Sequence, residues 1–199
     1  MILPIIAAVV VRAAAQYAVR QGMKYAAKRA LQRQIKSKIS KAIKEGRKTL
    51  KQDKKRRENC KNCKRQHELK NPCSALRKGG KGGTSNYRGG SYSGSRNTGI
   101  ESNHMPARAA YPKNHPFSGS RAPAIQMKPS DHRGVVSTGS GGAANAHRSI
   151  QRRLIKNGKT DQAFAMDAAD IISKTGDTYA EAIGEAAAYL DCLKKFGKL

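Results

Sequence analysis

Two short segments of the chain hold side chains that together could cleave a phosphodiester bond. The first contains Asn103 and His104, and the second contains Asp131, His132 and Arg133. Imidazole can take a proton from water, and imidazole with oxygen ligands can hold a divalent cation that neutralises charge on a phosphate. An arginine can bind the phosphate oxygens through its paired N–H groups. These residue types are therefore compatible with hydrolysis of a phosphodiester bond, but they do not predict it by themselves.

The first segment is predicted to be a strand that ends at its histidine. Residues 100–104 form a short run that changes from apolar to polar and finishes in Asn103 and His104. Pro106 follows almost at once, and it cannot donate a hydrogen bond to a strand ladder. We therefore expect His104 at the end of a strand.

The second segment is predicted to be a strand followed by a helix. Residues 124–127 alternate weakly between apolar and polar, and Pro129 stops the strand. Ser130 is a favoured N-cap, so the helix is expected to begin at Asp131 and His132. Another polar pair then lies on a first helical turn.

Four motifs of the second half carry a resemblance to a known family. They are Glu101-Ser-Asn-His-Met-Pro106, Pro123-Ala-Ile-Gln-Met127, Asp131-His-Arg133 and Gln151-x-x-Leu-Ile-x-x-Gly158. In this order they resemble the HNH, or His-Me finger (endonuclease VII-like), nuclease domains at the C-termini of bacterial polymorphic toxins. The similarity covers about residues 73 to 195. It implies an α+β fold in which a small ββα-metal finger is followed by C-terminal helices.

The resemblance also implies the roles of the site residues. His104 would be the general base, and a divalent cation, Mg²⁺ or Mn²⁺ ahead of Zn²⁺, would be held by Asn103, Asp131 and His132. The family often has a second histidine where Asn103 stands, but an amide oxygen can still bind a hard cation. Arg133 and Arg148, the latter on the helix after the site, are candidates for phosphate contact.

The implied function is a toxin effector that cleaves nucleic acid, with DNA favoured over RNA. Its expected partners are the nucleic acid and an acidic immunity protein, and it would be secreted or delivered to act in the cytoplasm of a target cell. The plain alternative is that His104 is an ordinary loop histidine and that Asp131 and His132 merely begin a helix. A second functional alternative is a basic nucleic-acid-binding protein without enzymatic activity.

The charge of the chain is concentrated in its first half. The formal net charge is +27, and residues 1–100 hold 26 of the 40 lysines and arginines but only 4 of the 13 acidic residues. Such a block attracts phosphate polymers or an anionic membrane, with an affinity that falls as salt rises. We divide the chain into a basic helical extension or linker (1–57), a linker containing cysteines and many Gly, Arg and Tyr residues (58–99) and a nuclease-like domain (100–199).

The N-terminal part is predicted to be mainly one long helix. The apolar run 2–11 is about half of the ~20 residues that a membrane span needs. Residues 13–50 contain no proline, and Leu31, Ile35, Ile39 and Ile43 recur every four residues, which predicts a basic amphipathic helix. This helix could bind a membrane surface or nucleic acid, or it could be a linker to the catalytic part.

The cysteines allow more than one interpretation. Cys60, Cys63, His67 and Cys73 have an overall span similar to that of a zinc knuckle. A disulfide between Cys73 and one of the first two, or free thiols, are together favoured over a zinc site. Cys192 lies in the last predicted helix and is interpreted as a small buried side chain. Three helices, over 144–157, 161–174 and 178–195, are predicted to complete the fold, and glycines at 158 and 176 end the first two.

Overall fold

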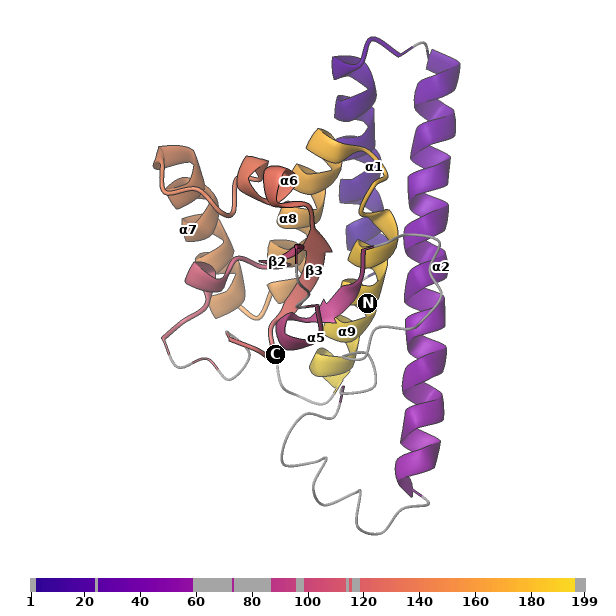
Figure 1. Ribbon diagram of the computed structural model, residues 1–199, viewed down its shortest axis with the longest axis vertical. Helices are drawn as coiled ribbons and strands as arrows, with labels where there is room; N and C mark the ends of the chain where they lie inside the picture. Colours follow the sequence, from indigo (N-terminus) through magenta and orange to yellow (C-terminus); the bar gives the residue numbers. More distant parts are fainter. Residues whose placement is uncertain are drawn as a thin grey trace.

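The computed structural model describes residues 3–23, 25–58, 73, 87–95, 99–113, 115 and 119–195. Helices surround a small antiparallel sheet, which confirms the predicted α+β class (Figure 1). The helices are α1 (Leu3–Arg20), α2 (Tyr25–Glu58), α5 (Tyr92–Ser95), α6 (Pro129–Gly134), α7 (Gly142–Lys156), α8 (Thr160–Thr175) and α9 (Ala180–Lys195), with a 3-10 turn, η1 (Arg108–Ala110). The strands are β1 (Gly89–Ser91), β2 (Glu101–His104) and β3 (Pro123–Met127).

The sheet places His104 at the end of an edge strand. Its strand order is β1-β3-β2, and both pairings are antiparallel. β2 ends at His104, which lies opposite Ala124 of β3, as the position of Pro106 predicts. Every residue of β3 is buried, so the strand that leads to α6 is held between its two neighbours.

The helix after β3 begins two residues earlier than predicted. α6 starts at Pro129 and its N-cap is Lys128, so Ser130 is not the cap. The hydroxyl of Ser130 instead approaches the Asp131 carboxylate at 3.4 Å. Proline suits the first helical position because its φ is already helical and the N–H that it lacks would have no partner there.

The predicted single N-terminal helix is wrong, because the chain turns back between α1 and α2. The turn contains Gly22, whose φ of +64° is a conformation that side-chain-bearing residues rarely adopt. α1 packs on α8 and α2 packs on α9, so the two N-terminal helices form a hairpin along one side of the molecule (Figure 1). Among the described residues no helix is long and apolar enough to cross a membrane.

The N-terminal helices belong to the main hydrophobic core and are not an extension outside it. Ile35, Ile39 and Ile43 of α2 are buried as their spacing predicts, in the same cluster as Phe164 of α8 and Leu190 of α9. The sequence shows that α2 has an apolar stripe but not which surface covers it, and that surface is α9.

Two glycines let the neighbouring elements approach α9 closely. A Cβ on Gly184 would lie 2.6 Å from the Cβ of Ala42 in α2. A Cβ on Gly89 would lie 1.9 Å from the carbonyl oxygen of Ala182, between β1 and α9. Both contacts exclude a larger residue, so these glycines set the distance between α9 and its partners.

The C-terminal helices agree with the predicted ones to within two residues at each end. α7, α8 and α9 follow one another, and Gly158 and Gly176 come just after α7 and α8 with positive φ. Their local signals are strong, because glycine readily adopts the conformation that ends a helix.

The cysteine predictions are wrong for Cys73, and for Cys192 only the predicted burial is confirmed. Cys73 forms a disulfide with Cys192 of α9, at a sequence separation of 119, and both are buried. Cys73 is therefore not available to a zinc site while this bond exists. The other proposed zinc ligands, Cys60, Cys63 and His67, lie outside the described residues.

Candidate active site

His104 has the environment of a general base. Its imidazole stacks on the ring of Tyr92, with the ring centroids 4.0 Å apart and the planes 18° apart. The buried Nε2 has no hydrogen-bond partner within the described part of the chain. Burial lowers the pKa of His104 to about 4, although a hydrogen bond to the backbone of Gly119 opposes this shift. The ring is therefore neutral at pH 7, with a nitrogen able to take a proton.

Arg108 is a charged neighbour of His104 that sequence reasoning did not single out. It lies in η1, it is exposed, and its positive charge contributes to the low pKa of His104. A guanidinium beside a candidate base is suited to bind the phosphate on which that base would act. The weak signal in the sequence is its position four residues after His104.

His132 is joined to a carboxylate that sequence reasoning did not assign to the site. Its Nδ1 forms a very short hydrogen bond with Oε2 of Glu101, and Nη2 of Arg133 lies 3.2 Å from the other carboxylate oxygen. The hydrogen bond from His132 is the largest cause of the lowered pKa of Glu101. Glu101 and Asn103 are two residues apart on β2 and so share a face of the sheet, which is the signal that could have identified Glu101.

Asp131 is engaged elsewhere. Its carboxylate accepts a hydrogen bond from the hydroxyl of Tyr179 at 2.6 Å, and the same hydroxyl accepts one from the backbone N–H of Lys128 at 3.1 Å. Tyr179 is buried in the main core. Asp131 therefore ties the first turn of α6 to the turn before α9, and the structure places it in an anchoring contact.

Asn103 is buried beside Ser137. Its Oδ1 lies 3.4 Å from the Ser137 hydroxyl, and its Nδ2 has no partner among the described residues. A buried amide N–H without a partner is costly unless a water or another acceptor satisfies it. A phosphate oxygen would do so, whereas a cation would require the oxygen of this side chain.

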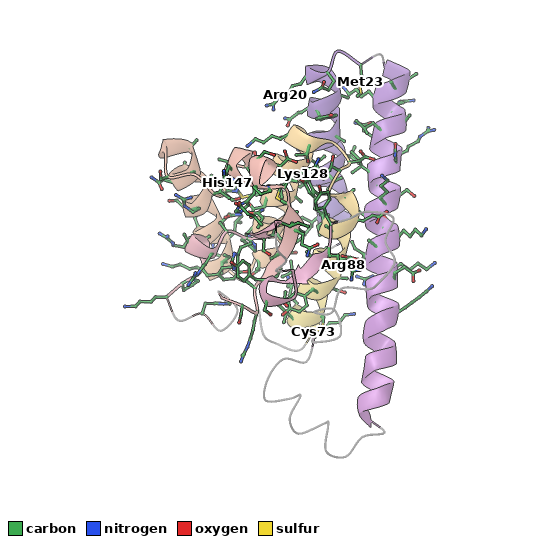
Figure 2. The ribbon with its side chains drawn as sticks, viewed as in Figure 1. Arg20, Met23, Cys73, Arg88, Lys128 and His147 are labelled. Carbon is green, nitrogen blue, oxygen red and sulfur yellow. A yellow bond between two sulfur atoms is a disulfide. The ribbon has the colours of Figure 1, made fainter. Side chains whose placement is uncertain are left out.

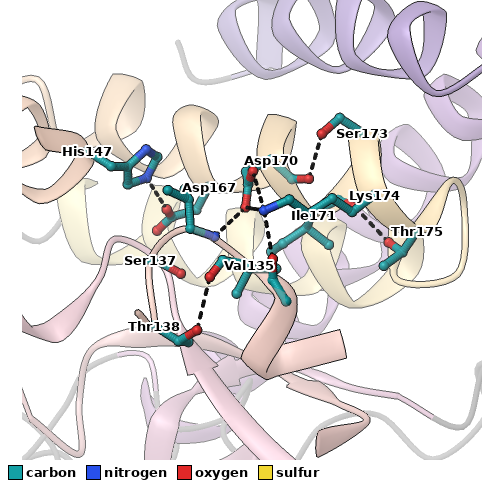
Figure 3. A network of polar contacts seen from close by, with 12 residues as sticks. Val135, Ser137, Thr138, His147, Asp167, Asp170, Ile171, Ser173, Lys174 and Thr175 are labelled. Carbon is teal, nitrogen blue, oxygen red and sulfur yellow. Dashed lines mark hydrogen bonds and ion pairs between the residues drawn. The ribbon is translucent and has the colours of Figure 1, made fainter. Parts of the chain in front are cut away.

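The loop after α6 is fixed by charged side chains of α7 and α8 (Figure 3). The backbone N–H of Val136 donates to Asp170 at 2.8 Å, and Lys174 donates to the carbonyl of Gly134 at 2.8 Å. Arg148 donates to the carbonyls of Ser137 and Gly139. Arg148 thus holds this loop in place, a use of its guanidinium that differs from the predicted phosphate contact.

A second histidine and carboxylate pair joins α7 to α8. Nε2 of His147 lies 2.7 Å from Oδ1 of Asp167, which is 1% exposed (Figure 3). Burial raises the pKa of Asp167, and the hydrogen bond from His147 opposes that shift. The pair joins the two helices that carry Arg148 and Asp170. These two residues in turn hold the loop after α6 in place.

The predicted metal ligands are only partly assembled. The described residues contain no group of three or more His, Cys, Asp or Glu side chains placed to hold a metal ion. His132 does fit a ligand, because its Nδ1 meets Glu101 and leaves Nε2 for a metal, and metal-binding histidines are commonly oriented by a carboxylate in this way. One imidazole is a small ligand set, and Mg²⁺ prefers oxygen ligands, although it usually keeps several waters and takes further ligands from substrate phosphates.

The chain was compared with protein-family models, with curated proteins and with solved structures. None of the three comparisons gave a match. The function proposed below therefore depends on the geometry of His104 and its neighbours and on the motifs quoted above.

Proposed function

We propose that the protein is a metal-dependent endonuclease that hydrolyses phosphodiester bonds, with DNA as the favoured substrate. The observation that carries this proposal is the state of His104: a neutral imidazole, stacked on Tyr92, whose Nε2 has no partner in the described structure. Nearby are an exposed arginine, Arg108, and the Glu101–His132 pair. These are the groups that hydrolysis of a phosphate diester needs.

His104 would act through Nε2, which would take a proton from a water molecule as the water oxygen attacks phosphorus. The bond from phosphorus to the leaving oxygen then breaks, and that oxygen takes up a proton from solvent. Tyr92 and the Gly119 backbone hold the imidazole so that Nε2 keeps one direction. Arg108 and the exposed Arg133 would bind phosphate oxygens, which positions the phosphorus and stabilises its developing charge.

The proposed metal is Mg²⁺ or Mn²⁺, and His132 would hold it through Nε2 with Glu101 as the orienting carboxylate. Bound there, the ion would neutralise charge on the scissile phosphate and the leaving oxygen. Zn²⁺ is the weaker alternative, because it usually takes three or four protein ligands. Asp131 is not proposed as a direct ligand, since its carboxylate is already bonded to Tyr179.

The finer fold that we propose is a ββα-metal finger formed by β2, β3 and α6. It is supported by their order along the chain, by the antiparallel pairing of β2 with β3 and by the packing of α6 on β2. In this arrangement His104 lies at the end of β2 and His132 lies on the helix that follows β3. The resemblance to polymorphic toxins further leads us to propose a delivered effector with an acidic immunity protein, and the net charge of +27 would favour such a partner.

The test is plasmid nicking by the purified full-length protein with Mg²⁺ or Mn²⁺, repeated with EDTA. The His104→Ala variant should lose activity, and His115→Ala is the matched control, because His115 is another histidine after β2 but packs on Tyr111. Equal loss in both variants, or nicking that continues in EDTA, would contradict the proposal.

A second candidate function is nucleic-acid binding without cleavage. It is favoured by the exposed lysines and arginines along α2, which need no catalytic group to bind phosphates. A protein that retards DNA with a strong salt dependence but never nicks it, with any of Mg²⁺, Mn²⁺ or Zn²⁺, would be this binder.

A further inference from the structure

The outer face of α2 carries a row of exposed cations. Arg33, Lys41, Lys44 and Lys48 are all exposed and recur at helical spacing on the side opposite the buried isoleucines, and we call these four residues the α2 strip. Figure 2 shows side chains with nitrogen tips projecting outward from α2. Within residues 26–48 the only acidic residue is Glu45, which lies 3.1 Å from Lys48 in an exposed ion pair. Such a pair contributes little and does not cancel the charge of the strip.

The strip has the dimensions of a contact along a nucleic-acid backbone. From Arg33 to Lys48 the helix rises by 15 residue steps, or about 22 Å at about 1.5 Å per step. A duplex presents about one phosphate charge for every 1.7 Å of its axis, so the strip can meet several phosphates at once. None of its side chains distinguishes one base from another, and the contact would be independent of sequence.

The same face is poorly suited to a membrane or to a protein partner. A helix that lies in a membrane surface inserts its apolar side, but Ile35, Ile39 and Ile43 of α2 are buried against the core. Protein interfaces usually have apolar or aromatic side chains at their centre. The described part of α2 exposes no large hydrophobic side chain.

The strip lies on the other side of the molecule from the candidate base. α2 packs on α9, α9 packs on β1 and β3, and β2 with His104 is the far edge of the sheet (Figure 1). At about 10 Å per packed layer, the strip and β2 are on the order of 20 Å apart. Because the strip faces away from the sheet, with α9, β1 and β3 between it and β2, one short straight duplex cannot lie on both faces.

We propose that the α2 strip binds the phosphate backbone of a second stretch of nucleic acid, away from the stretch at His104. Its effect on cleavage rests on the proposed function, but its binding does not. A long or bent DNA would engage both faces, and a duplex of about one helical turn, about 34 Å long, would engage one. The strip would thus favour long substrates without choosing a sequence.

The test uses full-length His104→Ala protein, so that DNA is bound and not cut. All four strip residues are changed to Glu in one variant and to Gln in a second, which guards against misfolding of the first. The control changes four other exposed cations, Arg20, Arg153, Lys156 and Lys159, to Glu, for the same change in net charge. Circular dichroism checks the fold of each, and fluorescence anisotropy follows binding to a 60-base-pair duplex from 50 to 300 mM salt.

In the strip variants the slope of log affinity against log salt should become shallower by about 3.6, because each of the four phosphate contacts removed accounts for about 0.9. The control should lose clearly less. Equal slopes in strip and control variants would overturn the proposal. So would unchanged DNA binding together with lost binding to phosphatidylserine vesicles, because the strip would then be a lipid surface.

Cleavage separates this proposal from the proposed function. With His104 intact, the strip variants should cut plasmid with a higher KM and cut a 10-base-pair duplex at the parental rate. Cleavage of both lengths impaired alike would overturn the proposal. If the parent protein cuts neither substrate, the proposed nuclease function is refuted. The anisotropy measurement would still test whether the α2 strip binds DNA.

Discussion

The edge of the sheet at β2 and the outer face of α2 use charge in opposite ways. At β2 the carboxylate of Glu101 is paired with His132 and Arg133, and burial keeps His104 neutral. On α2 the four cations of the strip are exposed to water, whereas Lys38 and Arg47 of the same helix pair with Asp177 and Asp191. Chemistry at one atom needs packing that fixes its protonation, whereas attraction to a polymer needs only the sum of exposed charges.

The largest expected effect that separates the two regions is the loss of cleavage when the proposed base, His104, is removed. His104→Ala should lower the cleavage rate by about 10²- to 10⁴-fold, which is typical of a lost general base. DNA binding should remain, because the exposed cations are untouched. Single-turnover cleavage and anisotropy on the same samples measure both effects. A variant that cleaves at the parental rate would remove His104 from the mechanism.

The second prediction concerns the packing that the two regions share. Ile39→Ala leaves a cavity between α2 and α9, and it should lower the free energy of unfolding by about 2 to 5 kcal/mol. Urea denaturation measures this loss, with Ser37→Ala on the exposed face as control. A change below about 0.5 kcal/mol would mean that α2 is not part of the core. The same packing predicts that deletion of residues 1–50 exposes the core of α8 and α9.

The third prediction follows from the lowered pKa of His104. Above pH 6.5 the histidine is neutral in the folded and unfolded states alike, so its contribution to stability is fully present. As pH falls from about 6.5 to about 4, the unfolded chain gains a proton that the folded chain does not, and stability drops by up to about 3 kcal/mol. Urea denaturation at several pH values should show this drop in the parent and less of it in His104→Gln. Matching curves would indicate that the histidine is not held neutral.

The pH dependence of cleavage should reflect the same protonation of His104. Because the base is neutral down to about pH 4, kcat/KM should stay level between pH 7 and 5 if no other group titrates. A fall centred near pH 6.5 would show that His104 titrates as an exposed histidine and that burial does not set its protonation.

The smallest expected effects are on metal affinity. Asp131 and His132 are neighbours on α6, but we expect them to contribute differently to metal binding. His132→Ala should weaken metal binding by about 10- to 100-fold, and Asp131→Asn should weaken it less, because Asp131 contacts Tyr179. Asn103→His should move the preference toward softer ions such as Zn²⁺. Calorimetric titration of Mn²⁺ and Zn²⁺ measures the order. Unchanged affinity in His132→Ala would exclude that histidine as a ligand.

Local patterns in the sequence were enough to predict several elements. The end of β2 at His104, the helix that carries Asp131 and His132, and the three C-terminal helices all follow from proline, glycine and apolar spacing within a few residues. The stripe of isoleucines in α2 is likewise a local pattern. Such signals act through the backbone conformation of neighbouring residues, and they do not depend on what lies across the fold.

Contacts between distant residues were decided only by the tertiary structure. Glu101 meets His132 across 31 positions, Tyr179 meets Asp131 across 48, and Cys73 meets Cys192 across 119. The packing of α1 and α2 on α8 and α9 is of the same kind. A sequence shows which side chains can form hydrogen bonds or disulfides and which helices have an apolar face to bury. Which partner each one finds depends on how the helices pack around the sheet, and no short stretch of residues contains that information.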